Sequence, residues 1–164
     1  MNGEKSMKTQ KDIKDSAQQK QYEDLIARAI RKLPDAYAPY SKFHVAAALL
    51  AADGSVTEGV NVENATYPAG ICAERTAIFW AVSNGCRSFR AIVIVGCHEE
   101  WLEKDAFCNL QLPAYCPPCG ICRQVMREFA DPEKFEVILA KTPQDYKVYK
   151  LAELLPESFG PENL

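Results

Sequence analysis

Three cysteines and one glutamate lie in two short blocks of this 164-residue chain. Cys72 and Glu74 belong to the segment CAER, and Cys119 and Cys122 belong to the segment PCGIC. A tetrahedral zinc ion with three protein ligands keeps its fourth position for water, whereas a structural zinc site uses four protein ligands. A carboxylate beside such a water can accept and deliver its protons. The two blocks therefore predict a catalytic zinc site in which Glu74 transfers protons.

Each cysteine block is expected to open a helix. Cys119 and Cys122 are three residues apart, so at the start of a helix their side chains share one face. The N-terminus of a helix has free N–H groups and a positive dipole end, and both favour the thiolate over the thiol. Arg75 follows Glu74 directly and could donate hydrogen bonds to the ligand sulfurs, offsetting the negative charge of three thiolates. The alternative for Arg75 is an ordinary surface arginine in the first turn.

The hydrophobic pattern predicts the elements that position these blocks. The expected elements are helices over 22–33, 72–83, 119–130 and 151–155, and strands over 43–51, 56–61, 91–95, 135–140 and 147–150. Helices and strands alternate after an initial strand–turn–strand hairpin, which is typical of an α/β domain. We therefore predict a three-layer α/β/α sandwich with a mixed, roughly five-stranded sheet.

Composition favours one domain over residues 20–164, preceded by an extension over residues 1–19. That extension is rich in Lys, Gln, Asp and Ser and offers little to bury, so it is predicted to be disordered. The remaining chain is long enough to bury a sizeable core, since 48% of all residues are hydrophobic.

Charge and cysteine content limit the expected partners and location. The net charge is −3 and no basic run occurs, which argues against nucleic acid and favours a small substrate. No apolar run approaches the roughly 18 residues that cross a bilayer, so no membrane partner is expected. Seven cysteines without a secretory signal indicate a reducing compartment, and we expect a cytoplasmic protein.

Several segments beyond the two blocks resemble the small, homotetrameric cytidine deaminases of pyrimidine salvage. The segments are Tyr40-Ser41-x-Phe43-x-Val45, residues 61–65, Tyr67-Pro68, and residues 70–78, 119–129 and 154–161. The two blocks also match the zinc-deaminase pattern of three cysteine ligands, a glutamate that is not a ligand, and Pro-Cys-x-x-Cys. The resemblance covers roughly residues 20–164. It implies one zinc ion per subunit and hydrolysis of cytidine and 2′-deoxycytidine to uridine and 2′-deoxyuridine, with release of ammonia.

The same resemblance implies roles for individual residues. They are Cys72, Cys119 and Cys122 as zinc ligands, Glu74 for proton transfer, Phe43 and the Ala73 backbone for the base, Asn61 and Glu63 for the ribose 3′-hydroxyl, and Tyr67 and Phe159 for completing a neighbouring subunit's pocket. Without the resemblance, Phe43 reads as strand core, Asn61 and Glu63 as a solvated polar edge, and Phe159 as a clasp on its own subunit.

The chain departs from the family pattern at two places. Ala46 stands where the family usually has Gly, and its methyl group could narrow the pocket or be tolerated there. Residues 96–117 form a longer connection that adds Cys97, His98, Cys108 and Cys116. These four residues could form a second metal site, but we expect the cysteines to be free surface thiols instead. Cys116 and Cys119 form a rival Cys-x-x-Cys pair, which we reject because the two prolines between them hold the pair out of a helical turn.

Three other functions compete with cytidine deamination. An aminonucleoside-antibiotic deaminase of the blasticidin type would keep the same metal motif. A nucleic-acid-editing deaminase would typically use His as the first ligand and would need a basic surface. A purely structural zinc module would want a fourth ligand and would have no use for Glu74.

Overall fold

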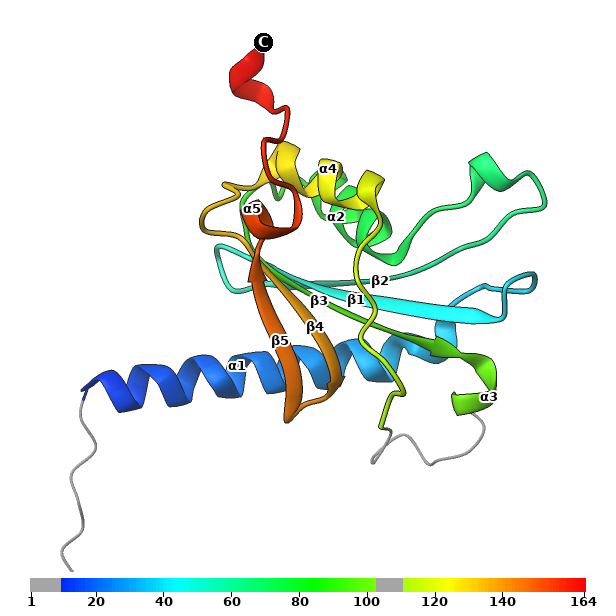
Figure 1. Ribbon diagram of the computed structural model, residues 1–164, viewed down its shortest axis with the longest axis horizontal. Helices are drawn as coiled ribbons and strands as arrows, with labels where there is room; N and C mark the ends of the chain where they lie inside the picture. The colour runs from blue at the N-terminus through cyan, green and yellow to red at the C-terminus, as the bar shows by residue number, and fades with distance from the viewer. Residues whose placement is uncertain (1–9, 103–110) are drawn as a thin grey trace, which may run out of the picture.

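The computed structural model describes residues 10–102 and 111–164, with only the backbone described for residues 10–15. Its elements form three layers, with α1 on one face of a five-stranded sheet and α2 and α4 on the other (Figure 1). The elements are α1 (Gln10–Lys32), η1 (Leu33–Asp35), β1 (Phe43–Ala51), β2 (Val56–Val60), η2 (Tyr67–Ala69), α2 (Ala73–Ser83), β3 (Phe89–His98), α3 (Glu99–Leu102), α4 (Gly120–Phe129), β4 (Glu136–Thr142), β5 (Asp145–Lys150), α5 (Leu151–Leu154) and η4 (Pro161–Asn163). The predicted fold class is confirmed.

The sheet has the strand order β2-β1-β3-β4-β5. Its neighbouring strands are antiparallel except for β3 and β4, which are parallel, so the sheet is mixed as expected. Parallel neighbours need a crossover connection, and α4 lies in the chain between these two strands. This crossover places the start of α4 on the same sheet face as α2 (Figure 1).

Strand β1 shows why an alanine-rich run forms a strand here. Ala46, Ala48 and Leu50 are buried against α1, while Ala47 and Leu49 are buried against the layer of α2 and α4. Successive residues of a strand face opposite sides of the sheet, so burial on both sides compensates for the low strand propensity of alanine. The methyl group of Ala46 consequently faces the α1 layer, away from α2 and α4.

The first helix begins earlier than the sequence analysis predicts. Residues 10–19, which we expected to be disordered, form the start of α1, and residues 1–9 lie outside the described part. Lys, Gln and Ala are strong helix formers, so the helix continues outward from its packed portion although residues 16–20 are exposed. None of the helices within residues 10–102 and 111–164 combines the length and apolarity needed to cross a membrane.

The close approach of β2 and α2 depends on Gly59. A Cβ atom added at this residue would lie 2.5 Å from the carbonyl oxygen of Ala73 and 2.5 Å from the backbone nitrogen of Ala77. These atoms belong to the first turns of α2, so the backbone of β2 supports the start of that helix directly. The absent side chain at Gly59 thereby sets the distance between the sheet and the residues that open α2.

The expectation of surface thiols in the long connection is wrong for Cys97. This residue ends the buried part of β3 and is only 1% exposed in the core beneath α1. Burial raises the pKa of its thiol to about 11, which makes it a poor metal ligand and nucleophile. Cys108 lies outside the described residues. Within those residues, the single cluster with metal-ligand geometry lies elsewhere.

Candidate active site

Three cysteine sulfurs meet where α2 and α4 begin. Cys72 is the N-cap of α2, Cys119 is the N-cap of α4, and Cys122 lies in the first turn of α4. The three Sγ atoms lie within 4.8 Å of one another, with 3.9 Å between Cys72 and Cys119 and 3.4 Å between Cys119 and Cys122. Zinc–sulfur bonds of about 2.3 Å in a tetrahedron place the sulfurs about 3.8 Å apart. The three thiols therefore fit a zinc ion.

Local helix geometry explains how α4 presents its two thiols. The Sγ of Cys119 accepts the backbone N–H of Cys122 at 3.5 Å, so the cysteine acts as the helix cap. Both sulfurs then face one side at the helix N-terminus, as their spacing predicts. Cys116 is not part of the sulfur cluster, in agreement with the rejection of its pairing with Cys119.

The surroundings of the sulfur cluster favour the ionised form of the Cys72 thiol. A hydrogen bond from Cys122 and the nearby guanidinium of Arg75 lower the pKa of the Cys72 thiol to about 5. The Nη2 of Arg75 donates to the Cys72 Sγ at 3.6 Å, and its buried Nε has no partner among the described residues. A thiolate of this kind, supported by a neighbouring cation, suits a soft divalent metal such as zinc. The hydrogen bond to Cys72 and burial raise the pKa of the Cys122 thiol.

Glu74 lies in the first turn of α2, one residue beyond Ala73, and only 3% of it is exposed. Burial raises the pKa of its carboxyl group, and the negative charge of Cys72 raises it further, although the Glu74 backbone N–H opposes this shift. A carboxyl group with a raised pKa exchanges protons more readily near neutral pH. Glu74 is also the one buried polar or charged residue in the described part of the chain.

A cavity of about 610 Å³ opens beside the sulfurs and Glu74. This volume is within the range for small-molecule sites. The predicted site residues on its wall are Asn61, Glu63, Tyr67, Cys72, Glu74, Arg75 and Cys119. The cavity therefore joins the thiols of two helices to the polar loop that follows β2.

Asn61 and Glu63 are both half-buried, and both accept hydrogen bonds from backbone N–H groups. Asn61 Oδ1 accepts the N–H of Val45 at 2.8 Å, and its Nδ2 donates to the carbonyl of Phe43 at 2.9 Å. Glu63 Oε2 accepts the N–H groups of Tyr40 at 2.9 Å and Ser41 at 3.1 Å. These bonds, with a further one from the Ser41 hydroxyl as the largest cause, lower the pKa of Glu63. Both side chains thus reach the cavity in fixed orientations.

The remaining predicted site residues do not line the cavity of their own chain. The ring of Phe43 packs edge-on against His98 with 5.0 Å between ring centroids, and Ala73 is fully buried where α2 meets β2. Cys122 lies behind the cavity wall within the sulfur cluster. Phe159 lies in the C-terminal tail against α4 and is 59% exposed.

Cys116 is a cavity-wall residue that the sequence analysis misplaced at the surface. Its Sγ fills the space beside Gly96, where an added Cβ would lie 2.9 Å from that sulfur and 3.2 Å from the ring of Phe43. Burial raises the pKa of the Cys116 thiol to about 12, so it stays protonated. Its position immediately before the Pro-Pro-Cys segment is the only sequence signal that could have placed it here.

Comparison with known proteins relates this site to one family. The family model of the cytidine and deoxycytidylate deaminase zinc-binding region matches residues 19–138. A cytidine deaminase of Sporosarcina psychrophila is 42% identical over 142 residues, which cover 87% of this chain and 93% of that protein. A crystal structure of cytidine deaminase from Burkholderia pseudomallei is 42% identical with a TM-score of 0.69, covering 83% of this chain and 97% of that one. A blasticidin-S deaminase of Bacillus cereus is 33% identical over 115 residues, covering 70% of this chain and 76% of that protein.

Proposed function

The chain belongs to the zinc-dependent cytidine deaminase family, and we propose that it converts cytidine and 2′-deoxycytidine into uridine and 2′-deoxyuridine. Water replaces the amino group on the pyrimidine ring, and ammonia leaves. The observation that carries this proposal is the buried Glu74 placed with a three-sulfur cluster at the wall of one cavity. A structural zinc module would not need this carboxyl group or the open cavity.

Cys72, Cys119 and Cys122 would hold the zinc ion through their thiolates. Bound zinc supplies Lewis acidity, which lowers the pKa of water and makes it a nucleophile near neutral pH. Arg75 lies against Cys72 and would reduce the excess negative charge of three thiolates around a divalent ion. This cation beside the ligands strengthens the fit of the sulfur cluster to zinc.

Glu74 would carry the protons of the reaction. Its carboxylate would take a proton from the attacking water and deliver it to the ring nitrogen beside the amino-bearing carbon. A second proton would pass through the same group to the departing ammonia. Its raised pKa supports this double role, because the carboxyl group must release each proton it accepts.

The sugar would lie against the loop after β2. Asn61 and Glu63 would bind the ribose 3′-hydroxyl, and their orientation is already set by hydrogen bonds to the backbone. Phe43 and the Ala73 backbone would contact the base. Because Phe43 lies beside the cavity rather than on its wall, this contact requires its ring to turn from His98.

We further propose a homotetramer in which Tyr67 and Phe159 complete a neighbouring subunit's pocket. Large apolar side chains exposed on α2, α4 and the adjacent loops support an assembly of this kind, since soluble monomers rarely expose large apolar patches. They are Tyr67, Phe79, Trp80, Ile121 and Phe159. Light scattering should give about four times the 18.3 kDa mass of one chain.

We place the enzyme in the cytoplasm, in pyrimidine salvage, with free nucleosides as substrates and neither nucleic acid nor membrane as partner. The net charge of −3 supports a small substrate. The cysteines in the described ranges, which leave out Cys108, are all free thiols, as suits a reducing compartment.

The test compares wild type with Glu74→Gln by the loss of ultraviolet absorbance that accompanies cytidine deamination. The wild type should be active, while Glu74→Gln should keep its zinc and lose activity by about 10²–10⁴-fold. Glu58→Gln is the matched control, because Glu58 pairs with Arg28 on the surface of β2, outside the cavity. A zinc-loaded wild type that leaves cytidine intact but deaminates blasticidin S would favour the antibiotic deaminase, and inertness toward both would favour a structural zinc module.

A further inference from the structure

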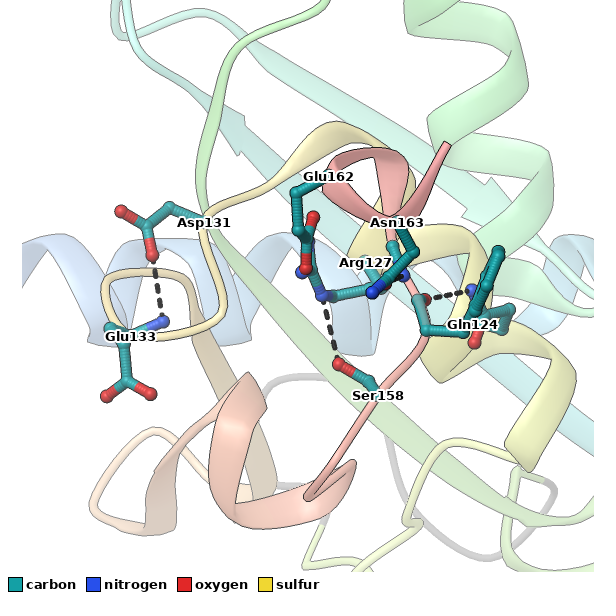
Figure 2. A network of polar contacts seen from close by, with 9 residues as sticks. Gln124, Arg127, Asp131, Glu133, Ser158, Glu162 and Asn163 are labelled. Atoms are coloured by element: carbon teal, nitrogen blue, oxygen red, sulfur yellow. Dashed lines mark hydrogen bonds and ion pairs between the residues drawn. The ribbon is translucent and has the colours of Figure 1, made fainter.

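The C-terminal tail is fastened to α4 by two side chains one turn apart. Arg127 Nε donates to the Ser158 hydroxyl at 2.9 Å, and its guanidinium also pairs with Glu162. Gln124 Nε2 donates to the carbonyl oxygen of Phe159 at 2.9 Å. Figure 2 shows these contacts gathered along one side of the helix. The backbone on both sides of the Phe159 ring is therefore held against α4.

Arg127 is more buried than Glu162, its partner in the tail. Only 11% of its side chain is exposed, whereas the Glu162 side chain is 58% exposed. The tail packs directly on the guanidinium, because a Cβ added at Gly160 would lie 2.5 Å from the Arg127 Cζ. Gly160 is itself buried and its N–H donates to Asn163 Oδ1 at 2.7 Å. Gly160 has an ordinary backbone conformation, so a side chain added here would displace only the ends of the Arg127 and Glu162 side chains.

Phe159 lies between these two anchored residues and points its ring away from its own core. The residue before it is bonded to Arg127 and the residue after it rests on the same guanidinium, yet Phe159 is 59% exposed. Anchoring of the backbone fixes the direction of the Phe159 Cα–Cβ bond and so limits where the ring can reach, and the ring has no partner within its own hydrophobic core. Such a ring can contact another subunit or a ligand at a lower entropic cost than a ring on a flexible tail.

We infer that Arg127 is a positioning residue, which sets the direction of Phe159 so that its ring can enter the pocket of a neighbouring subunit. This inference rests on the proposed function, in which Phe159 completes that pocket. Arg127 acts only through the tail, because it is absent from the wall of the cavity in its own chain. Loss of Arg127 should therefore weaken nucleoside binding without affecting zinc or proton transfer.

The experiment measures KM and kcat for cytidine in Arg127→Gln, Phe159→Ala and the double variant. Phe159→Ala should raise KM about 3–10-fold, the range for one aromatic stacking contact. Arg127→Gln should raise KM to a similar extent, with zinc content unchanged and kcat nearly so. In the Phe159→Ala background, Arg127→Gln should add no further increase, since the arginine acts through that ring.

Two further variants separate positioning from general stability. Gly160→Ala keeps the arginine but places a methyl group against its guanidinium, so it should raise KM as Arg127→Gln does. Glu162→Gln removes only the exposed partner of Arg127 and should leave KM unchanged. Melting temperature and mass, measured on all variants, show whether any change in KM comes from unfolding or loss of assembly. If Arg127→Gln unfolds or dissociates, the KM of Gly160→Ala tests the positioning role in its place.

The outcomes are distinguishable. An inactive wild type overturns the proposed function and this inference together. An active wild type with unchanged KM in Phe159→Ala removes the role of Phe159, and with it that of Arg127. A raised KM in Phe159→Ala beside a wild-type KM in Arg127→Gln overturns the inference alone, as would additive effects in the double variant.

Discussion

Replacement of Gly59 by alanine should displace the start of α2, although Gly59 does not line the cavity in which the substrate is expected to bind. The added Cβ would lie 2.5 Å from two backbone atoms of α2, where ordinary contact begins at 3.4 Å. The shortfall is about 0.9 Å, and neither obstacle can rotate away because both are main-chain atoms. The helix must therefore move away from β2, or β2 must bend.

The expected cost is at the upper end of the range for overpacking, about 3 kcal/mol. For a domain of this size, that corresponds to a fall of roughly 6–12 °C in melting temperature. The displaced turn carries Cys72 and Glu74, so deamination should fall more steeply than stability. Positional errors of about 1 Å at a reacting group can cost on the order of 10²-fold in rate.

The assay is thermal unfolding at equal protein and zinc concentrations, since bound ligands and assembly both shift the melting temperature. Gly120→Ala is the matched control: Gly120 opens α4, and an added Cβ there would have no neighbour within 4 Å. Alanine at Gly120 should leave stability unchanged or raise it by up to about 1 kcal/mol. Equal melting temperatures for Gly59→Ala and wild type would show that the close approach of β2 and α2 does not require glycine at this position.

Three further changes test other parts of the molecule. Cys116→Ala should leave one zinc per chain by elemental analysis, whereas Cys122→Ala should lose the metal; the reverse would show that the ligands are misassigned. Arg75→Gln should lower zinc affinity by about 10–100-fold in a chelator competition, and unchanged affinity would exclude support of the ligands by this arginine. Tyr22→Phe should cost about 1 kcal/mol at neutral pH, because the Tyr22 hydroxyl donates to Glu136. Burial and Glu136 raise the pKa of Tyr22 above its ordinary value of 10, so its contribution is fully present below pH 10 and is lost progressively as the pH rises from 10 to the raised pKa. Urea unfolding should therefore show the difference from wild type shrinking above pH 10, and a constant difference would contradict this linkage.

Local patterns accounted for most of the elements and for the chemistry at the helix starts. The spacing of Cys119 and Cys122 predicts a shared face, and the structure caps α4 with the first of them. The order of helix-like and strand-like hydrophobic patterns along the chain predicts the layers, because helices and strands each present their apolar residues at a characteristic spacing.

Contacts between distant segments could not be read from the sequence. Gly59 appears as an unremarkable strand glycine until α2 is seen to rest on it. Cys97 lies in a polar connection by sequence, yet it is buried because β3 continues to His98. Arg127 reads as a surface residue of an amphipathic helix, and only the returning tail covers it. Each of these outcomes depends on which segment packs on a position, and a local pattern does not encode that.

The separation of the two sulfur-bearing helix starts has a consequence for biosynthesis. Cys72 and Cys119 are 47 residues apart, with β3 between them in the chain and paired to both β1 and β4. A chain emerging from the ribosome presents Cys72 before the other two sulfurs, and the segment between them contains the middle strand of the sheet, β3. The complete set of ligands therefore exists only once the chain has been synthesised past Cys122. Once loaded, the ion links the starts of α2 and α4 across this separation, so the free energy of metal binding adds to the packing that holds this helical layer on the sheet.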